Sequence, residues 1–492
     1  MGCAGKLSSA DRILKLLFLL LQSSANVSIL VMVMISCSLE KGNASEAHYH
    51  TLPLTSMLPP LVCNPTTSKG PGRKASMKVV HRFGPCSARG GDSPTMTEIL
   101  LLDQSRVESI QARLRSISLG KNNLNSESVD LPAVNPNPGG VGNYIVTVGL
   151  GTPAKDVELA FDTGSHLTWT QCEPCAVECY QQRLPRFNPA ASTTYSNLNC
   201  NSQACSQLEA ATNLPGQCED STATCSYQTS YLDGSHSIGE LATDRLTLTS
   251  TDVVDGFIFG CGQNNSLISG VEYGGLMGLG TASLSIVSQT SQQFGNYFSY
   301  CLPTPTGSDG HLTFGKNSAN ANNLNYTPFL KDKVGYYYIE ILGISVNGQP
   351  LSISPEVFQI PGTIIDSGTV ITRLPTPAYT ALRDAFKQHM TMYPEVVLQQ
   401  PQLKKLFDTC YDFTNYPNPT IPDISFTFGG NLEVHLDPRG VMAPLNNGGS
   451  AVCLAFSYST DGGIFGNYQQ QTFDVVYDVA GGQLGFASGG CS

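Results

Sequence analysis

Two segments of the chain each place an aspartate between an apolar run and a turn. One reads AFDTGSHLTWTQC over residues 160–172, and the other reads GTIIDSGTVITRLP over residues 362–375. In both, the aspartate (Asp162 or Asp366) is followed by a hydroxyl residue, a glycine and a second hydroxyl residue. One such triplet is usually a tight turn, because Asp caps its own backbone and Gly accepts left-handed conformations. Its recurrence 204 residues later favours two aspartates that act together.

Two carboxylates held close together cannot both ionise easily, so one pKa rises while the other falls, as in other enzymes with paired carboxylates. The ionised member can take a proton from a water, and the protonated member can donate to a carbonyl oxygen. This chemistry hydrolyses an amide without a covalent intermediate. The hydroxyls of Ser165 and Thr369 are placed to orient the outer carboxylate oxygens, and Gly164 and Gly368 permit a tight turn and close approach of two lobes.

A weak internal repeat extends beyond the triplets. Leu276-Met277-Gly278 begins 112 residues after Gly164, and Ile464-Phe465-Gly466 begins 96 residues after Gly368, so the two glycine spacings are 114 and 98 residues. The repeat predicts two similar lobes, each of which supplies one aspartate to a shared interface.

From residue 143 onwards the pattern is that of an all-β protein. The 492-residue chain is long enough for two or more lobes, and only 13% of its residues are charged, which disfavours long amphipathic helices. Alternating or continuous apolar runs bounded by glycine-rich turns predict strands; they are NYIVTVGLG, VELAFDTG, GHLTFG, GYYYIEILGISVNG and FDVVYDVAGGQLGFA. Two segments predict helices: one from Thr376, as cap residue, with Pro377 in the first turn, and one from Ser283.

The first 142 residues differ from the rest in charge. They hold 14 Lys and Arg against 9 Asp and Glu, whereas residues 143–492 hold 13 against 29. Residues 1–38 are typical of a long secretory signal peptide, with a retained membrane anchor at 16–37 as the alternative. Residues 39–142 are expected to form a basic prosegment that docks on the acidic body and blocks it, with a simple linker or folding aid as the alternative. Its amphipathic run Ile99–Leu114 contains Arg106 and Arg113.

Cysteines and glycan acceptor triplets indicate the secretory pathway. Twelve of the 16 cysteines lie between Cys172 and Cys491, which favours a disulfide framework over a redox or zinc pair at Cys172 and Cys175. Asn264 and Asn325 begin acceptor triplets for N-glycosylation. We expect no metal and no cofactor.

Longer motifs carry a resemblance to a known family. CSYQTSYLDGS, FGCGQNN, GLMGLG, FSYCLP, the two aspartate segments and the C-terminal IFGNYQQQTFDVVYDVAGGQLGFASGGC resemble pepsin-family aspartic endopeptidases of the plant nepenthesin-like branch, and FGPCSAR at 83–89 resembles their prosegments. The resemblance covers 143–492. It implies an all-β, bilobal fold of two pseudo-twofold-related lobes, here 143–320 and 321–492, with the active site in the cleft between them.

The resemblance also implies residue roles. Asp162 and Asp366 match the catalytic pair. Tyr231 matches the tyrosine of a flap that closes over substrate, and Trp169, the only tryptophan, matches the residue whose indole N–H holds that tyrosine. Substrate contacts are expected at Tyr231, Asp233, Gly164 and Gly368, with Ser165, Thr369 and Trp169 in support. The implied disulfides are Cys172–Cys175, Cys179–Cys261, Cys200–Cys225, Cys205–Cys218, Cys301–Cys491 and Cys410–Cys453.

Two positions depart from the family pattern. His166 stands where the family usually has Asp, and we expect it to face solvent or pack locally rather than to act in catalysis. Leu232 stands where the flap usually has Gly, which puts flap mobility and substrate preference in question, not the fold.

The sequence as a whole predicts a monomeric, secreted acid endopeptidase made as a zymogen. Its expected partners are polypeptide substrates and its own prosegment, and its expected destination is the extracellular space or the vacuole. The alternative is a silent binding protein on the same fold, such as a xylanase inhibitor. A serine hydrolase lacks a Gly-x-Ser-x-Gly motif, nucleic acid is disfavoured by the acidic body, and we expect no membrane contact in the mature form.

Overall fold

The computed structural model describes most of the chain from residue 48 onwards. The described ranges are 48–57, 75–82, 84, 95–118, 144–220, 223–230, 235–267, 272–304, 310–316, 324–331, 333, 335–445 and 451–491. The expected signal peptide and the flap residues Tyr231, Leu232 and Asp233 lie outside them. In the described part, no helix is long and apolar enough to cross a membrane.

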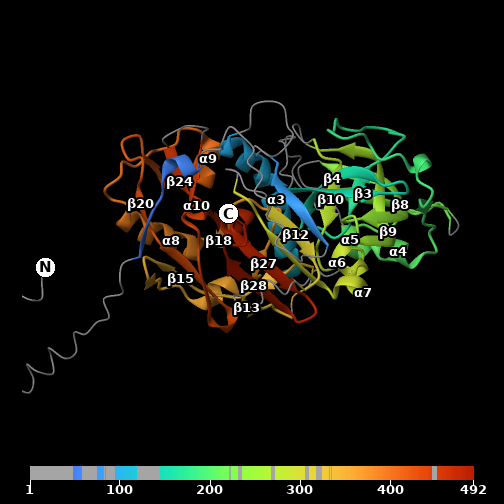
Figure 1. Ribbon diagram of the computed structural model, residues 1–492. Coiled ribbons are helices and arrows are strands. Elements are labelled where there is room, and N and C mark those ends of the chain that lie inside the picture. Colours follow the sequence, from blue (N-terminus) through green and yellow to red (C-terminus); the bar gives the residue numbers. More distant parts are fainter. Residues whose placement is uncertain are drawn as a thin grey trace, which may run out of the picture. The chain divides into compact units, whose positions relative to one another are not determined.

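A 14-stranded sheet joins the first half of the chain to the C-terminal strands (Figure 1). Its neighbours follow the order β13 (Asn325–Pro328), β28 (Gln483–Ser488), β27 (Phe473–Asp478), β11 (Tyr297–Cys301), β12 (Gly310–Phe314), β2 (Ser76–His81), β3 (Tyr144–Leu150), β4 (Lys155–Asp162), β10 (Gly275–Gly278), β5 (Trp169–Gln171), β9 (Val253–Ser266), β8 (His236–Thr247) and β6 (Ser196–Asn197), with β7 (Ser226–Ser230) paired to β8.

The remaining described strands, all but β1 from the second half of the chain, build four smaller sheets. They are β14 (Tyr338–Ile339), β17 (Thr363–Ile365), β26 (Gly463–Phe465), β18 (Thr372–Pro375) and β25 (Phe456–Ser459); β16 (Gln349–Pro350), β15 (Ile341–Val346), β21 (Ile424–Phe428) and β22 (Leu432–His435); β19 (Cys410–Asp412), β24 (Ala451–Leu454) and β23 (Met442–Pro444); and β1 (Tyr49–Thr51) with β20 (Thr420–Pro422).

The described α-helices are short apart from α3 and α8. They are α3 (Met96–Ser118), α4 (Gln203–Ser206), α5 (Leu208–Thr212), α6 (Ile286–Gln289), α7 (Ser291–Phe294), α8 (Thr376–His389), α9 (Pro401–Leu406), α10 (Pro438–Val441) and α11 (Asn467–Gln470). Single 3₁₀ turns occur at η1 (Leu54–Met57), η2 (Pro189–Ala191), η4 (Pro355–Phe358) and η5 (Gly429–Asn431). The dominance of strands confirms the predicted all-β class.

Both predicted helices of the body form, with differences in detail. Helix α8 starts at Thr376, but this residue does not cap it: its hydroxyl donates to the carbonyl of Ser459 at 3.1 Å. The segment from Ser283 divides into α6 and α7 at Thr290. Ser285 caps the start of α6, because its side-chain hydroxyl accepts from the backbone N–H of Ser288.

The two lobes repeat one strand arrangement around their aspartates. In the first lobe β10 runs parallel to β4, with Gly278 opposite Asp162, and antiparallel to β5, which is parallel to β9. In the second lobe β26 runs parallel to β17, with Phe465 opposite Ile365, and antiparallel to β18, which is parallel to β25. The sequence repeat therefore corresponds to a structural repeat, and the bilobal prediction is confirmed.

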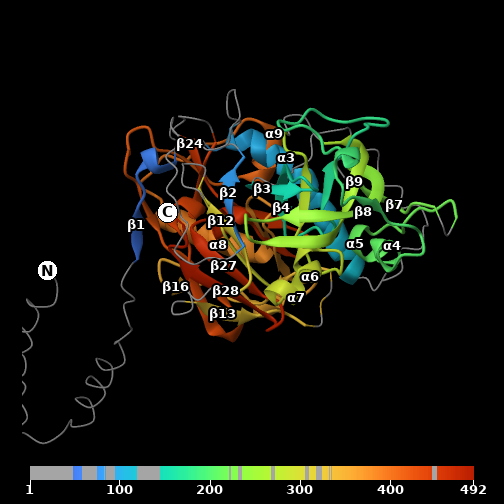
Figure 2. The same cartoon turned by 45° about the vertical axis from the view of Figure 1, so that its right-hand side comes forward.

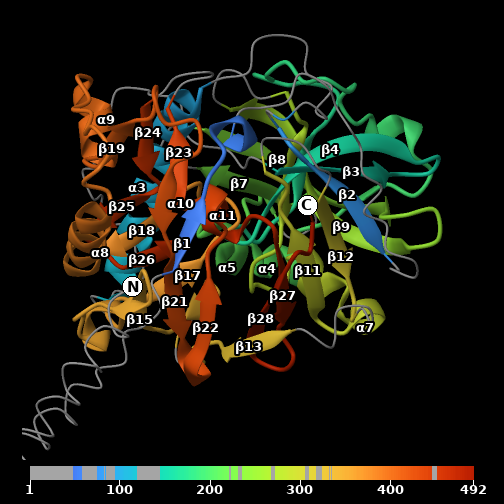
Figure 3. The same ribbon diagram turned by 60° about the vertical axis from the view of Figure 1, so that its left-hand side comes forward.

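Residues of the expected prosegment are built into the fold. Strand β2 lies between β12 and β3, with Val79 opposite both Gly310 and Val146 (Figure 2). Strand β1, labelled in Figure 3, pairs with β20 in the second half of the chain, with His50 opposite Ile421. Val79 and Met77 of β2 are buried, which explains why this segment alternates apolar and polar residues.

Six disulfides join the twelve cysteines from Cys172 onwards, and four of them differ from the expected pairing. Cys301–Cys491 and Cys410–Cys453 are as expected. Cys172 is bonded to Cys261 instead of Cys175, which leaves Cys175 to pair with Cys179. The reason is the parallel pairing of β5 with β9, which places the Cα atoms of Cys172 and Cys261 5.4 Å apart.

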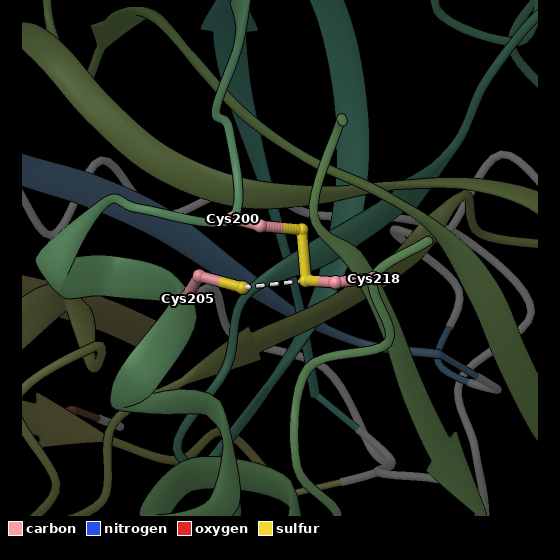
Figure 4. A group of neighbouring side chains, drawn as sticks. All are labelled: Cys200, Cys205 and Cys218. Atoms are coloured by element: carbon pink, nitrogen blue, oxygen red, sulfur yellow. Dashed lines mark hydrogen bonds between the residues drawn. A yellow bond between two sulfur atoms is a disulfide. The ribbon is translucent and has the colours of Figure 1, made fainter. Parts of the chain in front are cut away.

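The other two corrections involve one exchange of partners. The structure pairs Cys200 with Cys218 and Cys205 with Cys225, whereas the resemblance implied Cys200–Cys225 and Cys205–Cys218. The two bonds are neighbours, since the Sγ atoms of Cys205 and Cys218 lie 3.7 Å apart (Figure 4). The cluster of Cys200, Cys205 and Cys218 offers no thiolate to a metal, because all three sulfurs are in disulfides.

We expect peptide mapping of the unreduced protein to recover Cys172 linked to Cys261, a cross-link over 89 residues. A digest that separates residues 172–182 from 253–267 should give one mass for the linked pair, which reduction splits into two. Detection of a Cys179–Cys261 link instead would contradict the β5–β9 geometry. The Cys410–Cys453 link serves as the internal control, because sequence and structure agree on it.

Candidate active site

Asp162 and Asp366 meet where the two halves of the fold join, and each is held by its own turn. Both are almost fully buried, with exposed fractions of 1% and 0%. One oxygen of Asp162 accepts from the backbone N–H of Gly164 at 2.9 Å, and one oxygen of Asp366 accepts from that of Gly368 at 3.2 Å. The other oxygens accept from the hydroxyls of Ser165 and Thr369, the latter at 2.5 Å. The arrangement is the same in both lobes.

Hydrogen bonds between the two turns fix the aspartates relative to each other. The backbone N–H of Thr163 donates to the Ser367 hydroxyl at 3.1 Å, and the N–H of Ser367 donates to the Thr163 hydroxyl at 2.9 Å. These reciprocal bonds are buried, so each satisfies an N–H that would otherwise have no partner. The two residues occupy equivalent places in the aligned triplets, a signal visible in the sequence, although no role was predicted for them.

A second symmetric pair of threonines ties the turns to the repeat. Thr168 accepts from the N–H of Gly278 at 3.1 Å, and Thr372 accepts from the N–H of Gly466 at 3.0 Å. Each threonine follows its aspartate by six residues. This spacing is a sequence signal that links each triplet to its distant Gly, and the sequence analysis missed it.

Glycine is required in both triplets for space. A Cβ at Gly164 would lie 2.9 Å from an oxygen of Asp366, and one at Gly368 would lie 2.6 Å from an oxygen of Asp162. Neither glycine is among the residues with positive φ. The expectation of close approach is therefore correct, whereas a left-handed turn is not the reason for the glycine.

Arg106 of α3 bridges the two carboxylates. Its Nη1 and Nη2 donate to the two oxygens of Asp162 at 3.0 and 2.7 Å. Nη2 also donates to the two oxygens of Asp366 at 3.1 and 3.0 Å, and Nε donates to Asp366 at 3.4 Å. The guanidinium side chain is only 9% exposed. One cation thus fills the space between the aspartates.

The environment pushes the two carboxyl pKa values apart. At Asp162 burial raises the pKa, but Arg106 and the Ser165 and Gly164 hydrogen bonds outweigh it, so the pKa lies below its ordinary value. At Asp366 burial raises the pKa and the charge of Asp162 adds to this effect, so the pKa lies above its ordinary value despite Arg106. Of the two, Asp162 is the one that ionises first.

Helix α3 reaches this position because its apolar face is buried. Leu100, Val107 and Leu114 recur at helical spacing and are no more than 1% exposed. Val107 and Leu114 pack in a cluster with Ile364 of β17 and Ile464 of β26. Ile364 shortly precedes the Asp366 triplet, and Ile464 belongs to the repeated segment Ile464-Phe465-Gly466. The predicted amphipathic run is therefore a helix, and Figure 1 shows it between the strands of the first and second halves of the chain.

His166 packs against the turn that follows β10. Its Nδ1 accepts from the backbone N–H of Ala282 at 3.4 Å. Burial lowers the pKa of His166 to about 4, and the charge of Arg113 adds to that effect. The structure thus places His166 in local packing, with no hydrogen bond to either aspartate among the described residues.

Trp169 is 1% exposed, and its indole N–H has no hydrogen-bond partner among the described residues. An unsatisfied buried donor is costly, so this N–H is suited to an acceptor that lies outside the described residues. The expected acceptor, Tyr231, belongs to the flap segment that the structure does not describe.

The two predicted glycan acceptors lie on strands. Asn325 of β13 is exposed, and Asn264 of β9 is half-buried, with its side-chain oxygen 3.3 Å from Nε2 of His236.

Two β lobes that each bring one aspartate to a shared buried site define the pepsin-like class of protein. Comparison with known proteins places the chain within that class. The family model "Xylanase inhibitor N-terminal" matches residues 144–316, and "Xylanase inhibitor C-terminal" matches residues 336–488. An aspartyl protease family protein of Arabidopsis thaliana is 44% identical over 95% of this chain and 98% of its own length. Nepenthesin-1, an aspartic proteinase of Nepenthes gracilis, is 36% identical over 72% of this chain and 79% of its own. The chain therefore belongs to the pepsin-like family of plant aspartic proteases.

Solved structures agree on the fold. Basic 7S globulin from soybean superposes with a TM-score of 0.53 at 22% identity, over 70% of this chain and 91% of its own. Conglutin gamma from lupine seeds gives a TM-score of 0.54 at 23% identity, with 92% of its own chain covered. The six disulfides of the described part fit a protein of the secretory pathway.

We expect Thr163→Val and Ser367→Ala each to destabilise the protein, because each leaves one buried backbone N–H unsatisfied. The expected loss of unfolding free energy is about 1–3 kcal/mol for each variant. Denaturant unfolding at neutral pH measures it. The exposed Ser250→Ala should change stability by less than about 0.5 kcal/mol and is the matched control. Equal stability of all three variants would contradict a structural role for the cross-lobe bonds.

Proposed function

We propose that the chain is the zymogen of an aspartic endopeptidase that hydrolyses polypeptides at acidic pH. The observation that carries the proposal is the dyad of Asp162 and Asp366, complete with its glycine N–H groups, its hydroxyl partners and its cross-lobe bonds. A site built only to bind would not need two buried carboxylates face to face, because their desolvation is costly.

The chemistry follows from the unequal carboxyls. With Arg106 gone, the space between the aspartates is open to a water and a substrate carbonyl. Of the two carboxyls, which then share one proton, the ionised one takes a proton from the water as it attacks the carbonyl carbon. The protonated one donates to the carbonyl oxygen. The tetrahedral intermediate then collapses as a proton passes to the leaving nitrogen, and the dyad regains its single proton.

Arg106 supports the zymogen part of the proposal. Its guanidinium occupies the space in which water and substrate carbonyl would bind, and its charge favours the ionised form of both aspartates over the one-proton form. Residues 39–142 would act as the intramolecular inhibitor, with secretion directed by residues 1–38 and the final compartment either extracellular or vacuolar.

The sign of the pH dependence follows from the docked groups. The pKa of Asp162 is lowered on docking chiefly by Arg106, and that of Asp461 by its bond to Arg115 on the same helix. Both favour docking above the ordinary carboxyl pKa and lose their effect as pH falls through the lowered values. Burial raises the pKa of Asp103 to about 6, so this group acts in the opposite sense. Release is therefore expected in acid, as Asp162 and Asp461 become protonated.

The second candidate function is inhibition of a glycan-degrading enzyme, which the descriptions of the matching family models favour. Such a protein would need no dyad proton. Replacement of either aspartate by asparagine separates the two candidate functions, because only the protease loses its activity when one carboxyl becomes an amide.

We expect Asp162→Asn and Asp366→Asn each to lower kcat on a peptide substrate by about 10³-fold or more, because an amide cannot take part in the shared-proton chemistry. Cleavage of an internally quenched peptide library at pH 3–5 measures this, with far-UV circular dichroism to show that the variants fold. His166→Gln is the matched control beside the dyad and should keep activity within about tenfold. Near-normal rates in either Asn variant would refute the proposed dyad.

We expect the chain from residue 39 onwards to be cut between about Leu119 and Gly142 when the pH falls from 7 to about 4, and to gain activity at the same time. That segment lies outside the described residues. Because β2 pairs on both sides, the cut alone should leave the front fragment bound at pH 7, and acid should release it. Gel filtration of the cut protein at both pH values measures this. Full activity of the intact chain at pH 7 would contradict inhibition by residues 39–142.

We expect Arg106→Gln to raise the activity of the uncut chain at pH 5–6 by about tenfold or more, because the dyad loses its bridging cation. Arg115→Gln on the same helix is the matched control: its pair with Asp461 is exposed, so its effect should be less than about threefold. Equal activity of the two variants would show that Arg106 does not hold the dyad inactive.

A further inference from the structure

A buried arginine lies beneath α3, beyond the dyad. Arg373, on β18 seven residues after Asp366, is 2% exposed. Its Nε and Nη2 have no hydrogen-bond partner among the described residues. An arginine cannot discharge by losing its proton, and a buried guanidinium with open donors is costly. The chain keeps this cation at the edge of the site, although the proposed hydrolysis does not use it.

The group that faces Arg373 belongs to the helix that blocks the dyad. Asp103 of α3 is 1% exposed, and its Oδ2 lies 3.8 Å from Nη2 of Arg373. The same oxygen accepts from the backbone N–H of Val370 at 3.2 Å, while Oδ1 has no partner among the described residues. Asp103 precedes Arg106 by three residues, so the two side chains are about one helical turn apart. One face of α3 therefore presents a cation to the dyad and a carboxylate to Arg373.

The surroundings of Arg373 form a pocket rather than a closed core. A cavity of about 370 Å³ lies against α3, β25 and α9, and Figure 3 shows α3 beside β18 and β25. The titratable groups that act on Arg373 are Asp103 and Glu108 from α3 and Tyr458 from β25, and Lys405 from α9 lines the same cavity. Two of these groups, Asp103 and Glu108, come from α3, so departure of α3 would leave Arg373 facing the open site.

We infer that Arg373, with the N–H of Val370, is a subsite that accepts an acidic side chain of the substrate, and that Asp103 occupies this subsite in the zymogen. The inference rests on the proposed function, which it deepens by naming a substrate preference. The guanidinium offers a planar fork of donors that matches a carboxylate, and the Val370 N–H adds a third donor to the same group.

The subsite lies close to the bond that is cut. One helical turn is about 5 Å, and an extended chain rises about 3.3 Å per residue. The acidic side chain should therefore lie within about three residues of the scissile bond. Burial under a whole helix face raises the pKa of Asp103 to about 6 against the lowering effect of Arg373. An extended peptide covers the pocket less completely, so Arg373 should act more strongly on a substrate carboxylate than on Asp103.

The test uses the acid-activated chain and peptide libraries in which one position at a time is Glu or its neutral isostere Gln. We expect one position within three residues of the scissile bond at which Glu raises kcat/KM by about tenfold over Gln at pH 5. The ratio should shrink towards one at pH 3, because the substrate carboxylate is then protonated. In Arg373→Gln the ratio at pH 5 should fall to about one, because the carboxylate loses its partner.

Two further variants make the result specific. Lys405→Gln removes an exposed cation of the same pocket and should keep the tenfold ratio. Arg373→Lys keeps the charge without the fork and should keep part of the ratio, which also provides a variant more tolerant in folding. A wild-type enzyme that cuts peptides without an acid preference, or an Arg373→Gln enzyme that retains it, overturns the inference and leaves the proposed function intact.

If no peptide is cut at all, the proposed function fails, and binding still decides the inference. The same Glu and Gln peptides are then titrated into the acid-treated chain by fluorescence anisotropy. Tighter binding of the Glu peptide that disappears in Arg373→Gln supports the subsite, and equal binding overturns it.

Discussion

Two carboxylates buried face to face repel each other, and the geometry around Asp162 and Asp366 exists to hold them together against that repulsion. Each turn directs two donors at its own aspartate: the N–H of the glycine and the hydroxyl of Ser165 or Thr369. The reciprocal bonds of Thr163 and Ser367 then lock one turn to the other. Because the lobes repeat the same strands, the two turns meet as near-equivalent surfaces, and only glycine leaves enough room between them.

This arrangement makes the site an attractive place for a cation. Arg106 takes that place, with its guanidinium in contact with both carboxylates and its helix anchored by an apolar face. The attachment of the front segment is thus both electrostatic and hydrophobic. Strand β2 adds backbone pairing on two sides, which depends little on pH, whereas the Arg106 and Arg115 contacts depend on ionised carboxylates. A segment held in these two ways stays bound at neutral pH and loses its electrostatic contacts in acid, which is the behaviour that the proposed zymogen needs.

Helix α3 also bears on the substrate specificity of the proposed protease. In the proposed zymogen, α3 covers the surface that a substrate would use, so the groups it presents to that surface have the chemistry that the surface accepts. Arg106 is the cation that pairs with the dyad, and Asp103 is the carboxylate that faces Arg373 and accepts from the Val370 N–H. The fold shared with seed globulins at 22–23% identity does not carry this information, since the fold alone leaves side-chain chemistry free.

The sequence by itself determined the all-β class, the two-lobe repeat, the pair of aspartates and the amphipathic helix that carries Arg106. These features are local or periodic: strand alternation, a duplicated triplet and a helical spacing of apolar residues can all be read along the chain. The tertiary structure alone decided which distant groups meet. Cys172 bonds to Cys261 because β5 lies beside β9, a fact of strand order that spacing along the chain does not contain. Likewise, Arg373 faces Asp103, 270 residues away in the sequence, because α3 docks on β18. Glycine is required at positions 164 and 368 because the space between the lobes is narrow, not because of the backbone conformation. Pairings of this kind depend on packing between elements, and local sequence patterns carry no record of it.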